Sequence, residues 1–328
     1  MEIELKSSLK GKDLWLPLFS LFLSIIIFYV FYFNAVFNDP LSAIRVALIF
    51  MLAFIMAIPF VQLYILKVML TKISVNDKAL AFTGEYGRFF LINLGGILLT
   101  CITLGFYGPW YSRKIIDYIS SNTSLEGSPF NFKSTGGNLL KLTLLILVIP
   151  FIIFYTSLAA FVIATLDYNA GYTSPLGIFF AIYILASTLL AFALYAFYHF
   201  FYKWYVNFQW KDKSITLSTN FWPTIGIMLG QTILTIITFG IYWPARYIKL
   251  NRYFISKITI AENENNIGNF VFKGTCKNGF LYFWGQTLLT IITFGIYYPW
   301  AYTNIFNWTI NNTSVSSSKD LFIAAATN

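Results

Sequence analysis

Charged residues are scarce in this 328-residue sequence. Asp, Glu, Lys and Arg together make up 11% of the chain, whereas 58% of the residues are hydrophobic and 20% are aromatic. A typical soluble domain has roughly 25% charged residues, and so few charges would not cover the surface of a soluble fold of this size. The composition therefore predicts a polytopic membrane protein, and it excludes disordered, collagen-like and disulfide-rich secreted chains.

Residues that carry most enzyme chemistry are also scarce. Cys101 lies inside an apolar stretch and Cys276 in a polar loop, so we expect neither a disulfide nor a metal site. The only histidine, His199, cannot build a catalytic zinc site alone, and beside Lys203 and Trp204 it is expected to be satisfied or to face headgroups. No Asp or Glu falls inside an apolar window, and no phosphate-binding loop is present. We expect no catalytic residues, no metal, no cofactor and no enzyme activity.

A net charge of +9 at first points to nucleic acid. The basic residues, however, lie in short loops between apolar stretches, where they act as topology signals and contact anionic headgroups. The expected partner is therefore a lipid bilayer with anionic headgroups, and no nucleic acid is expected. The sequence indicates neither a substrate nor an oligomeric state.

Seven long uncharged windows divide the chain. Each holds about 20 apolar residues, the length of helix that crosses a hydrocarbon core of roughly 30 Å. The windows are Leu14–Asn38, Val46–Leu66, Phe89–Ser112, Leu142–Leu166, Tyr168–Tyr202, Ser214–Ala245 and Asn278–Ser318.

Basic residues set the expected orientation, because cytoplasmic loops carry an excess of Lys and Arg. Lys6, Lys10 and Lys12 place the start of the chain in the cytoplasm, and only the loops Asn34–Ala43 and Asp167–Pro175 are expected to face outward. This requires windows three, six and seven to enter and leave on one side, as re-entrant or steeply bent hairpins. Seven plain crossings with a weak charge bias are the alternative. The stretches then expected in the cytoplasm are Arg113–Lys133, Lys203–Lys213, Arg246–Lys257 and Lys273–Lys277.

The same three windows contain copies of one segment. Residues 230–244 read GQTILTIITFGIYWP, and residues 285–299 are identical to them at 13 of 15 positions. Residues 95–109 match the last copy at 9 of 15 positions. Chance does not produce this similarity, so the sequence predicts three internal repeats.

Each copy contains a glycine followed four residues later by a proline. The glycines are Gly105, Gly240 and Gly295, and the prolines are Pro109, Pro244 and Pro299. Glycine suits a left-handed helix C-cap, and proline is favoured in the first turn of a new helix. The pattern predicts a helix, a break and a second helix at the membrane surface.

Polar residues form a stripe on one face of the first helix in each copy. The stripes are Gln231, Thr235, Thr238 and Tyr242; Gln286, Thr290, Thr293 and Tyr297; and Thr100, Thr103 and Tyr107, which follow Gly96. Two interpretations remain open, namely helix–helix hydrogen bonding and a shared polar lining for a substrate or ion. In either case we expect the three first helices to pack against each other or to line one site.

The predicted fold is an all-α polytopic membrane protein with three repeats of a Gly/Pro-broken helix. The expected segments are a two-helix unit (1–75), the first repeat (80–135), two transmembrane helices (139–205), the second repeat (215–260), the third repeat (270–315) and a tail (316–328).

The first copy and its flanks resemble the YjgN-like bacterial inner-membrane proteins, a family of unknown function. The resemblance covers about residues 80–313 and departs in the second copy, which has Ala245 in place of Trp. The matching residues are Phe82, Gly84, Leu98–Gly105, Tyr107, Trp110, Tyr118, Asn122 and Thr123, with Trp300, Asn312 and Thr313 in the third copy. The resemblance implies a multi-pass protein of the bacterial cytoplasmic membrane with no established activity.

Two functions fit these expectations. The first is non-enzymatic transport or permeation of a small solute through a site lined by the broken helices. The alternative is a structural or envelope-assembly protein that transports nothing. A cavity lined by the three stripes would favour the first, and stripes consumed by mutual contacts would favour the second.

Overall fold

A computed structural model describes residues 1–171, 175–263 and 265–318 of the chain. Within these residues, eleven strands form one antiparallel sheet, so the all-α prediction is wrong. The strands are β1 (Glu2–Ser7), β2 (Ile73–Val75), β3 (Lys78–Ala79), β4 (Ala81–Phe82), β5 (Thr123–Leu125), β6 (Ser128–Phe132), β7 (Asn207–Trp210), β8 (Lys213–Leu217), β9 (Ile258–Glu262), β10 (Asn265–Phe272) and β11 (Thr313–Ser317).

The sheet is a nearly closed ring. Its strand order is β3-β2-β1-β11-β10-β9-β8-β7-β6-β5-β4, so β3 and β4 are the two edges. These edge strands are separated in the sequence by Leu80 alone, and the two edges therefore lie close together. Ile3, Ile260, Ile267 and Val315 form the buried apolar core of the sheet.

Pairs of helices connect consecutive strands of the sheet. In the described residues, five helical hairpins leave the sheet and return to it, so the body is not built from three repeats alone. The helices are α1 (Gly11–Asn38) and α2 (Pro40–Thr71); α3 (Tyr86–Ile102) and α4 (Gly108–Ser121); α5 (Gly136–Thr143), continued by a π-helical turn (Leu144–Val148) into α6 (Ile149–Asn169), and α7 (Leu176–Tyr205); α8 (Phe221–Ile237) and α9 (Trp243–Ile255); and α10 (Cys276–Ile292) and α11 (Tyr298–Asn311).

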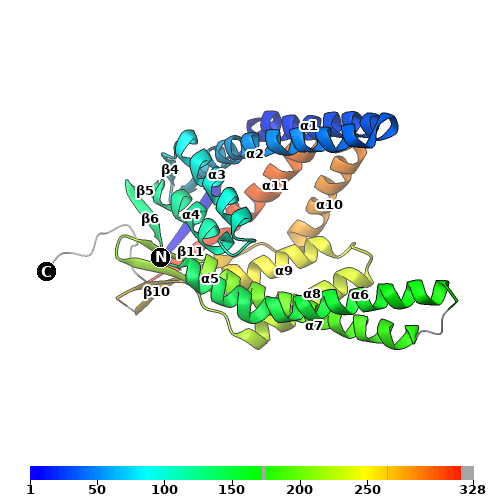
Figure 1. Cartoon of the computed structure of the whole chain (residues 1–328). Helices are drawn as coiled ribbons and strands as arrows, with labels where there is room; N and C mark the ends of the chain where they lie inside the picture. Colours follow the sequence, from blue (N-terminus) through cyan, green and yellow to red (C-terminus); the bar gives the residue numbers. More distant parts are fainter. Residues whose placement is uncertain (172–174, 264, 319–328) are drawn as a thin grey trace.

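All five hairpins are joined at the base in the same way. The residue after the ingoing strand donates its amide to a carbonyl just before, or at the first residue of, the outgoing strand. The bonds are Ser8 to Lys72 (3.1 Å), Thr83 to Asn122 (2.9 Å), Lys133 to Asn207 (3.0 Å), Ser218 to Lys257 (2.8 Å) and Lys273 to Asn312 (2.8 Å). Each hairpin therefore begins and ends on the same side of the sheet, at one open end of the ring (Figure 1).

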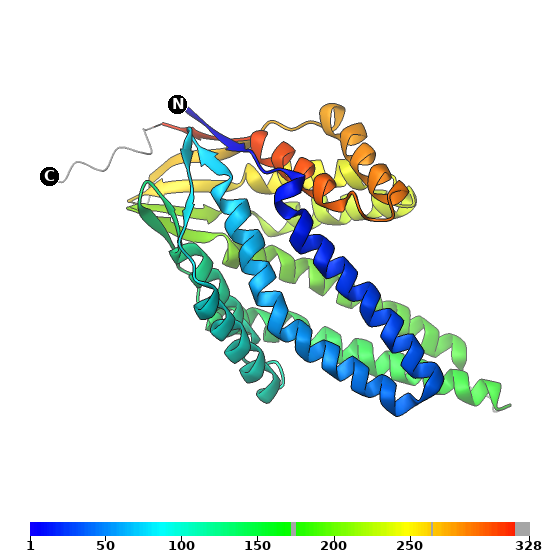
Figure 2. The same ribbon diagram turned by 90° about the horizontal axis from the view of Figure 1, so that it is seen from above.

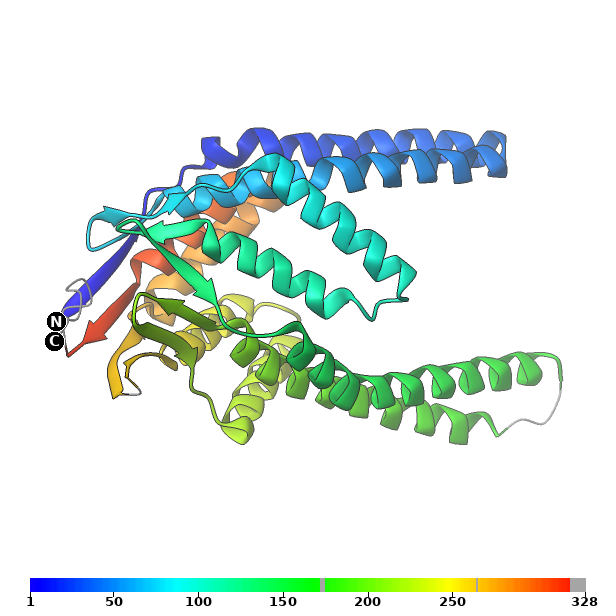
Figure 3. The ribbon, with the colours of Figure 1, turned by 60° about the vertical axis from the view of Figure 1, so that its left-hand side comes forward.

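The five hairpins differ in length. The helical segments Gly11–Asn38, Leu41–Thr71, Gly136–Asn169 and Leu176–Tyr205 are long and apolar enough to cross a membrane. They form the two long hairpins, α1/α2 and α5–α7. Figure 2 shows α1 and α2 side by side, and Figure 3 shows both long hairpins extending in the same direction away from the strands.

The other three pairs, α3/α4, α8/α9 and α10/α11, are called the short hairpins. Their first helices have 17 residues each, which gives about 26 Å at 1.5 Å per residue, less than a hydrocarbon core of roughly 30 Å. The three windows that contain them therefore bend back to the sheet and are not straight spans of membrane-crossing length.

Capping residues fix several helix starts. The Asp39 carboxylate accepts hydrogen bonds from the amides of Leu41 and Ser42 (3.1 and 3.0 Å), which allows α2 to begin directly after α1. Thr135 and Thr275 cap α5 and α10 in the same manner. Of the predicted outward loop Asp167–Pro175, residues 172–174 lie outside the described residues, as do residues 319–328 of the predicted tail.

Candidate functional site

Each short hairpin reverses direction through a left-handed turn. Between α8 and α9, Phe239 and Gly240 have φ of +49° and +84°, and the amide of Gly240 donates to the carbonyl of Thr235 (2.8 Å). Glycine adopts this φ without strain, and Pro244 in the first turn of α9 has no amide hydrogen to leave unpaired. The other turns are equivalent, with Leu104 (φ +50°), Gly105 (+94°) and Pro109, and with Phe294 (+49°), Gly295 (+88°) and Pro299.

The polar stripe of α8 forms its hydrogen bonds within its own hairpin. Thr235 and Thr238 donate their hydroxyl hydrogens to carbonyls four residues earlier in α8 (both 2.8 Å). The Thr238 oxygen also accepts the amide of Tyr242 (3.1 Å) across the turn. The Tyr242 hydroxyl donates to the side-chain oxygen of Gln231 (2.9 Å) and accepts from the ammonium of Lys249 (2.7 Å). These bonds hold α8 against α9.

The third copy makes the same connection, with Asn304 at the position of Lys249. Tyr297 donates its hydroxyl hydrogen to the Gln286 side-chain oxygen (3.2 Å), and the Asn304 amide group donates to the same oxygen (2.8 Å). Thr290 and Thr293 again donate to carbonyls of their own helix, both at 2.8 Å.

The first copy lacks the glutamine. Thr100 donates to the carbonyl of Gly96 (2.7 Å), and the Thr103 oxygen accepts the amide of Tyr107 (2.9 Å). The Lys114 ammonium lies 5.6 Å from the centre of the Tyr107 ring, so a cation–π contact occupies the place of the hydrogen-bonded pair.

The three stripes are not brought together. The helices α3, α8 and α10 pack mainly on their neighbours in the chain: α3 on α2 and α4, α8 on α7 and α9, and α10 on α9 and α11. We predicted that the three first helices pack against each other or line one site; α3, α8 and α10 do not pack substantially on one another, and no stripe residue lines the cavity described below. The shared spacing reflects similar bonding inside each hairpin and not a shared interface.

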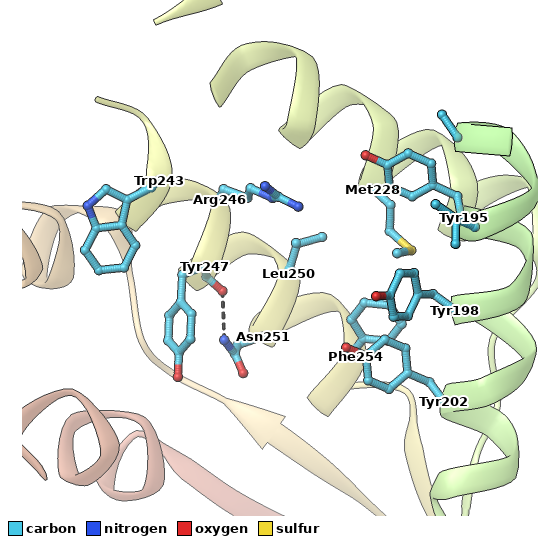
Figure 4. Close-up of a pocket in the computed structure, with 12 residues that line it drawn as sticks. Tyr195, Tyr198, Tyr202, Met228, Trp243, Arg246, Tyr247, Leu250, Asn251 and Phe254 are labelled. Atoms are coloured by element: carbon cyan, nitrogen blue, oxygen red, sulfur yellow. Dashed lines mark hydrogen bonds between the residues drawn. The ribbon is translucent and has the colours of Figure 1, made fainter. Parts of the chain in front are cut away.

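A cavity of about 840 Å³ lies between α7, α8 and α9 (Figure 4). The residues that line it do not include any member of the three stripes. Tyr195, Tyr198 and Tyr202 project from α7, and apolar side chains from α8 and α9 complete most of the wall. The rings of Tyr202 and Phe254 meet with centroids 5.0 Å apart, and Tyr195 donates a hydrogen bond to Thr232 of α8 (2.7 Å). The result is a largely apolar groove with a few hydroxyl groups.

One cation enters this cavity. Arg246 lies in the first turn of α9, and Figure 4 shows its guanidinium pointing from α9 towards α7. Throughout the described part of the chain, no side-chain hydrogen bond, ion pair or ring contact involves this guanidinium. Sequence reasoning missed the site because Arg246 was interpreted only as a topology signal and α7 carries no repeat.

His199 is buried, whereas we expected it to be satisfied by hydrogen bonds or to face headgroups. Its side chain is 2% exposed and packs edge-on against Phe221, with ring centroids 5.4 Å apart. Its Nδ1 atom is buried without a hydrogen-bond partner. In the described residues no three His, Cys, Asp or Glu side chains cluster as a metal site would require.

Apolar side chains occupy the distal turns of the short hairpins. Leu104, Phe239 and Phe294 are 90%, 96% and 88% exposed. These turns are the parts of the short hairpins farthest from the sheet, and large exposed apolar groups there indicate contact with a non-aqueous phase.

The family follows from comparison with known proteins. A family described as "Bacterial protein of unknown function (DUF898)" matches residues 21–271, more than half of the chain. The chain belongs to this family. Inner membrane protein YjgN of Salmonella typhimurium is 45% identical over 84 residues, which are 26% of this chain and 20% of the relative. The protein of the same name from Escherichia coli K12 is 38% identical over 69 residues, 21% and 17% of the two chains.

The relatives confirm the YjgN-like resemblance. Their names and the four long apolar helices support an inner-membrane location. The chain spans about a fifth of the length of the curated relatives it matches. No solved structure matches the chain. The family description names no activity, so function rests on the geometry of the molecule.

Proposed function

We propose that this family member is a multi-pass membrane protein whose sheet and first strand lie in the cytoplasm. The distal turns 103–107, 238–242 and 293–297 contain no Lys or Arg, whereas basic residues gather in and beside the strands. By the positive-inside rule, this distribution of charge supports a sheet on the cytoplasmic side, next to anionic headgroups. In this arrangement the long hairpins cross the membrane twice and the short hairpins enter and leave on the cytoplasmic side.

The function best supported is non-enzymatic binding of an amphiphilic small molecule, with its transport or permeation as the physiological role. The observation that carries this proposal is the cavity between α7, α8 and α9. Its volume of about 840 Å³ lies within the 300–1,000 Å³ typical of small-molecule sites. Its walls join a helix of membrane-crossing length, α7, to a short hairpin, so a ligand dissolved in the bilayer can reach it laterally.

Filling the cavity tests this proposal. Leu250 lines the cavity from α9, so Leu250→Trp should reduce binding of a neutral photoactivatable diacylglycerol to the full-length protein in nanodiscs, measured by the yield of photo-crosslinking as the lipid is titrated. Leu281→Trp is the matched control, because Leu281 is 78% exposed on α10, outside the cavity. Equal binding by both variants and the unmodified protein would remove the cavity from consideration.

A structural role is the second candidate, and a specific observation favours it. The polar stripes are consumed inside their own hairpins and leave no lining for a polar path through the three repeats. A protein that only shapes or anchors an assembly would bind the diacylglycerol no better than a bilayer does. The same titration therefore separates the two functions.

A further inference from the structure

Arg246 is specific to the second short hairpin. Counting from the proline that begins the second helix, the same position is Tyr111 in the first hairpin and Ala301 in the third. The Tyr111 hydroxyl donates to the Asn93 side chain (2.7 Å), so that position has an internal partner in the first hairpin. In the second hairpin the position carries a charge, and the charge has no internal partner in the described residues.

The position of Arg246 makes an unpaired charge costly. Nine residues separate it from the sheet-proximal end of α9 at Ile255, which gives about 14 Å along the helix. With the sheet at the cytoplasmic surface, the guanidinium lies within the membrane, where a charged side chain is costly unless it is paired or hydrated. Intramembrane arginines normally pair with an anion or reach water.

The described residues supply no such anion near Arg246. The residues lining the cavity include no Asp or Glu, and all the ion pairs found in the described residues belong to the sheet and its turns. The nearby Lys249 is also a cation and is engaged with Tyr242. Charge complementarity therefore calls for an external anion.

We propose that the cavity binds an anionic phospholipid, with its phosphate on Arg246 and its acyl chains along the apolar walls of α7 and α9. This inference rests on the proposed function and names its ligand class. A guanidinium binds phosphate oxygens through paired N–H donors. The hydroxyls of Tyr198 and Tyr202 line the same wall and offer further donors to the headgroup. A soluble anion would leave the apolar wall exposed, so the geometry favours a lipid.

Lipid selectivity of the full-length protein tests the proposal. Native mass spectrometry would count phosphatidylglycerol and phosphatidylcholine retained from equimolar mixed micelles. We expect the unmodified protein to prefer phosphatidylglycerol, and Arg246→Gln to lower that preference by about tenfold, the effect of one charge-assisted contact. Arg246→Lys should keep part of it, and circular dichroism would verify that each variant folds.

Lys249→Gln is the matched control, because Lys249 is a cation on the same helix that bonds Tyr242. It should leave the preference unchanged. An unchanged preference in Arg246→Gln would overturn the anion site, and diacylglycerol binding blocked by Leu250→Trp would still support the proposed function. Displacement of phosphatidylglycerol by millimolar inorganic phosphate would overturn the lipid assignment in favour of a free anion. If phosphate does not displace phosphatidylglycerol and Arg246→Gln lowers the preference for it while Lys249→Gln does not, the assignment of a lipid ligand is supported.

Discussion

The Tyr242 hydroxyl donates a hydrogen bond to the side-chain oxygen of Gln231, 2.9 Å away, and so joins the two helices of the α8/α9 hairpin. The two residues lie eleven positions apart in the sequence, one on each side of the turn. Their bond gives the glutamine a partner that lipid cannot provide. The polar pair Gln231–Tyr242 is thereby satisfied without a contact from another hairpin.

Removing this bond should destabilise the protein measurably. We expect Tyr242→Phe to lower the free energy of unfolding by about 1 kcal/mol, within the range measured for interhelical hydrogen bonds in membranes. Unfolding in mixed detergent–SDS micelles provides the measurement. Thr235→Val serves as the control, because the Thr235 hydroxyl bonds only to its own helix and its loss should cost clearly less. Equal losses would contradict the assignment of the tyrosine as the cross-hairpin contact.

The left-handed turn predicts that alanine substitution has different effects on stability at two glycines of the same hairpin. Gly240 has a φ of +84°, and a β-carbon there is strained whatever space surrounds it. We expect Gly240→Ala to cost about 1–2 kcal/mol of unfolding free energy. Gly230 lies inside α8, and no neighbouring atom lies within 4 Å of the position that a β-carbon would take, so Gly230→Ala should be neutral or stabilising. Thermal unfolding of both variants compares them, and the reverse order would refute the turn geometry.

The helical part of the fold was predictable because its signals are local. Gly105 and Pro109 mark a break and a restart that depend only on backbone geometry. The sheet was not predicted, because its strands are only two to eight residues long, and β11 and nearly all of β8 fall inside apolar windows that were assigned to helices. Even so, Phe82 and Asn122, which carried the family resemblance, flank the junction where Thr83 bonds to Asn122. The motif reflects a strand–helix junction.

The candidate site shows a different limit of prediction from sequence. Spacing places Gln231 and Thr235 on one helical face but does not reveal which element covers that face. The covering residue is Tyr242 of the same hairpin. The cavity was missed because its walls combine α7, which carries no repeat, with Arg246, a position that is uncharged in the other two short hairpins. Such a combination is visible only once the helices are placed in space.

An ion pair across the gap between the two ends of the sheet predicts that the sheet is sensitive to acid. Glu126, in the β5–β6 turn, pairs with Lys78 of β3 and with Lys211 after β7. The hydrogen bond from Lys78 holds the pKa of Glu126 below its ordinary value of 4.5, partly opposed by desolvation and aided by Lys211. A lowered folded-state pKa contributes stability above pH 4.5 that disappears as the pH falls through the folded-state value.

Glu126→Gln should therefore lower the denaturant midpoint at neutral pH, and its difference from the unmodified protein should shrink as the pH falls to about 3. Circular dichroism at a series of pH values measures both proteins. Asp212→Asn is the control, because Asp212 forms no ion pair in the described part of the chain. A difference that grows on acidification would reverse the predicted sign and refute the role of this pair.

The two native cysteines report the depth of the short hairpins. Cys276 is the first residue of α10, beside the sheet, whereas Cys101 lies next to the last residue of α3, near the distal turn. About 23 Å of helix separates Cys101 from the start of α3, so it should lie in the hydrocarbon core. In inside-out vesicles a charged maleimide should label Cys101→Ser, which retains Cys276, and should not label Cys276→Ser, which retains Cys101.

The proposed topology, with the sheet in the cytoplasm and the distal turn inside the bilayer, predicts that neither variant reacts with the charged reagent in intact cells. Labelling after denaturation in SDS is the control that each thiol is present. The decisive residue is Cys101. If the impermeant reagent labels it from outside the cell, then α3 crosses the membrane completely and the seven-crossing arrangement holds. Protection from both sides, with Cys276 open to the cytoplasmic side, requires a hairpin that turns back within the membrane.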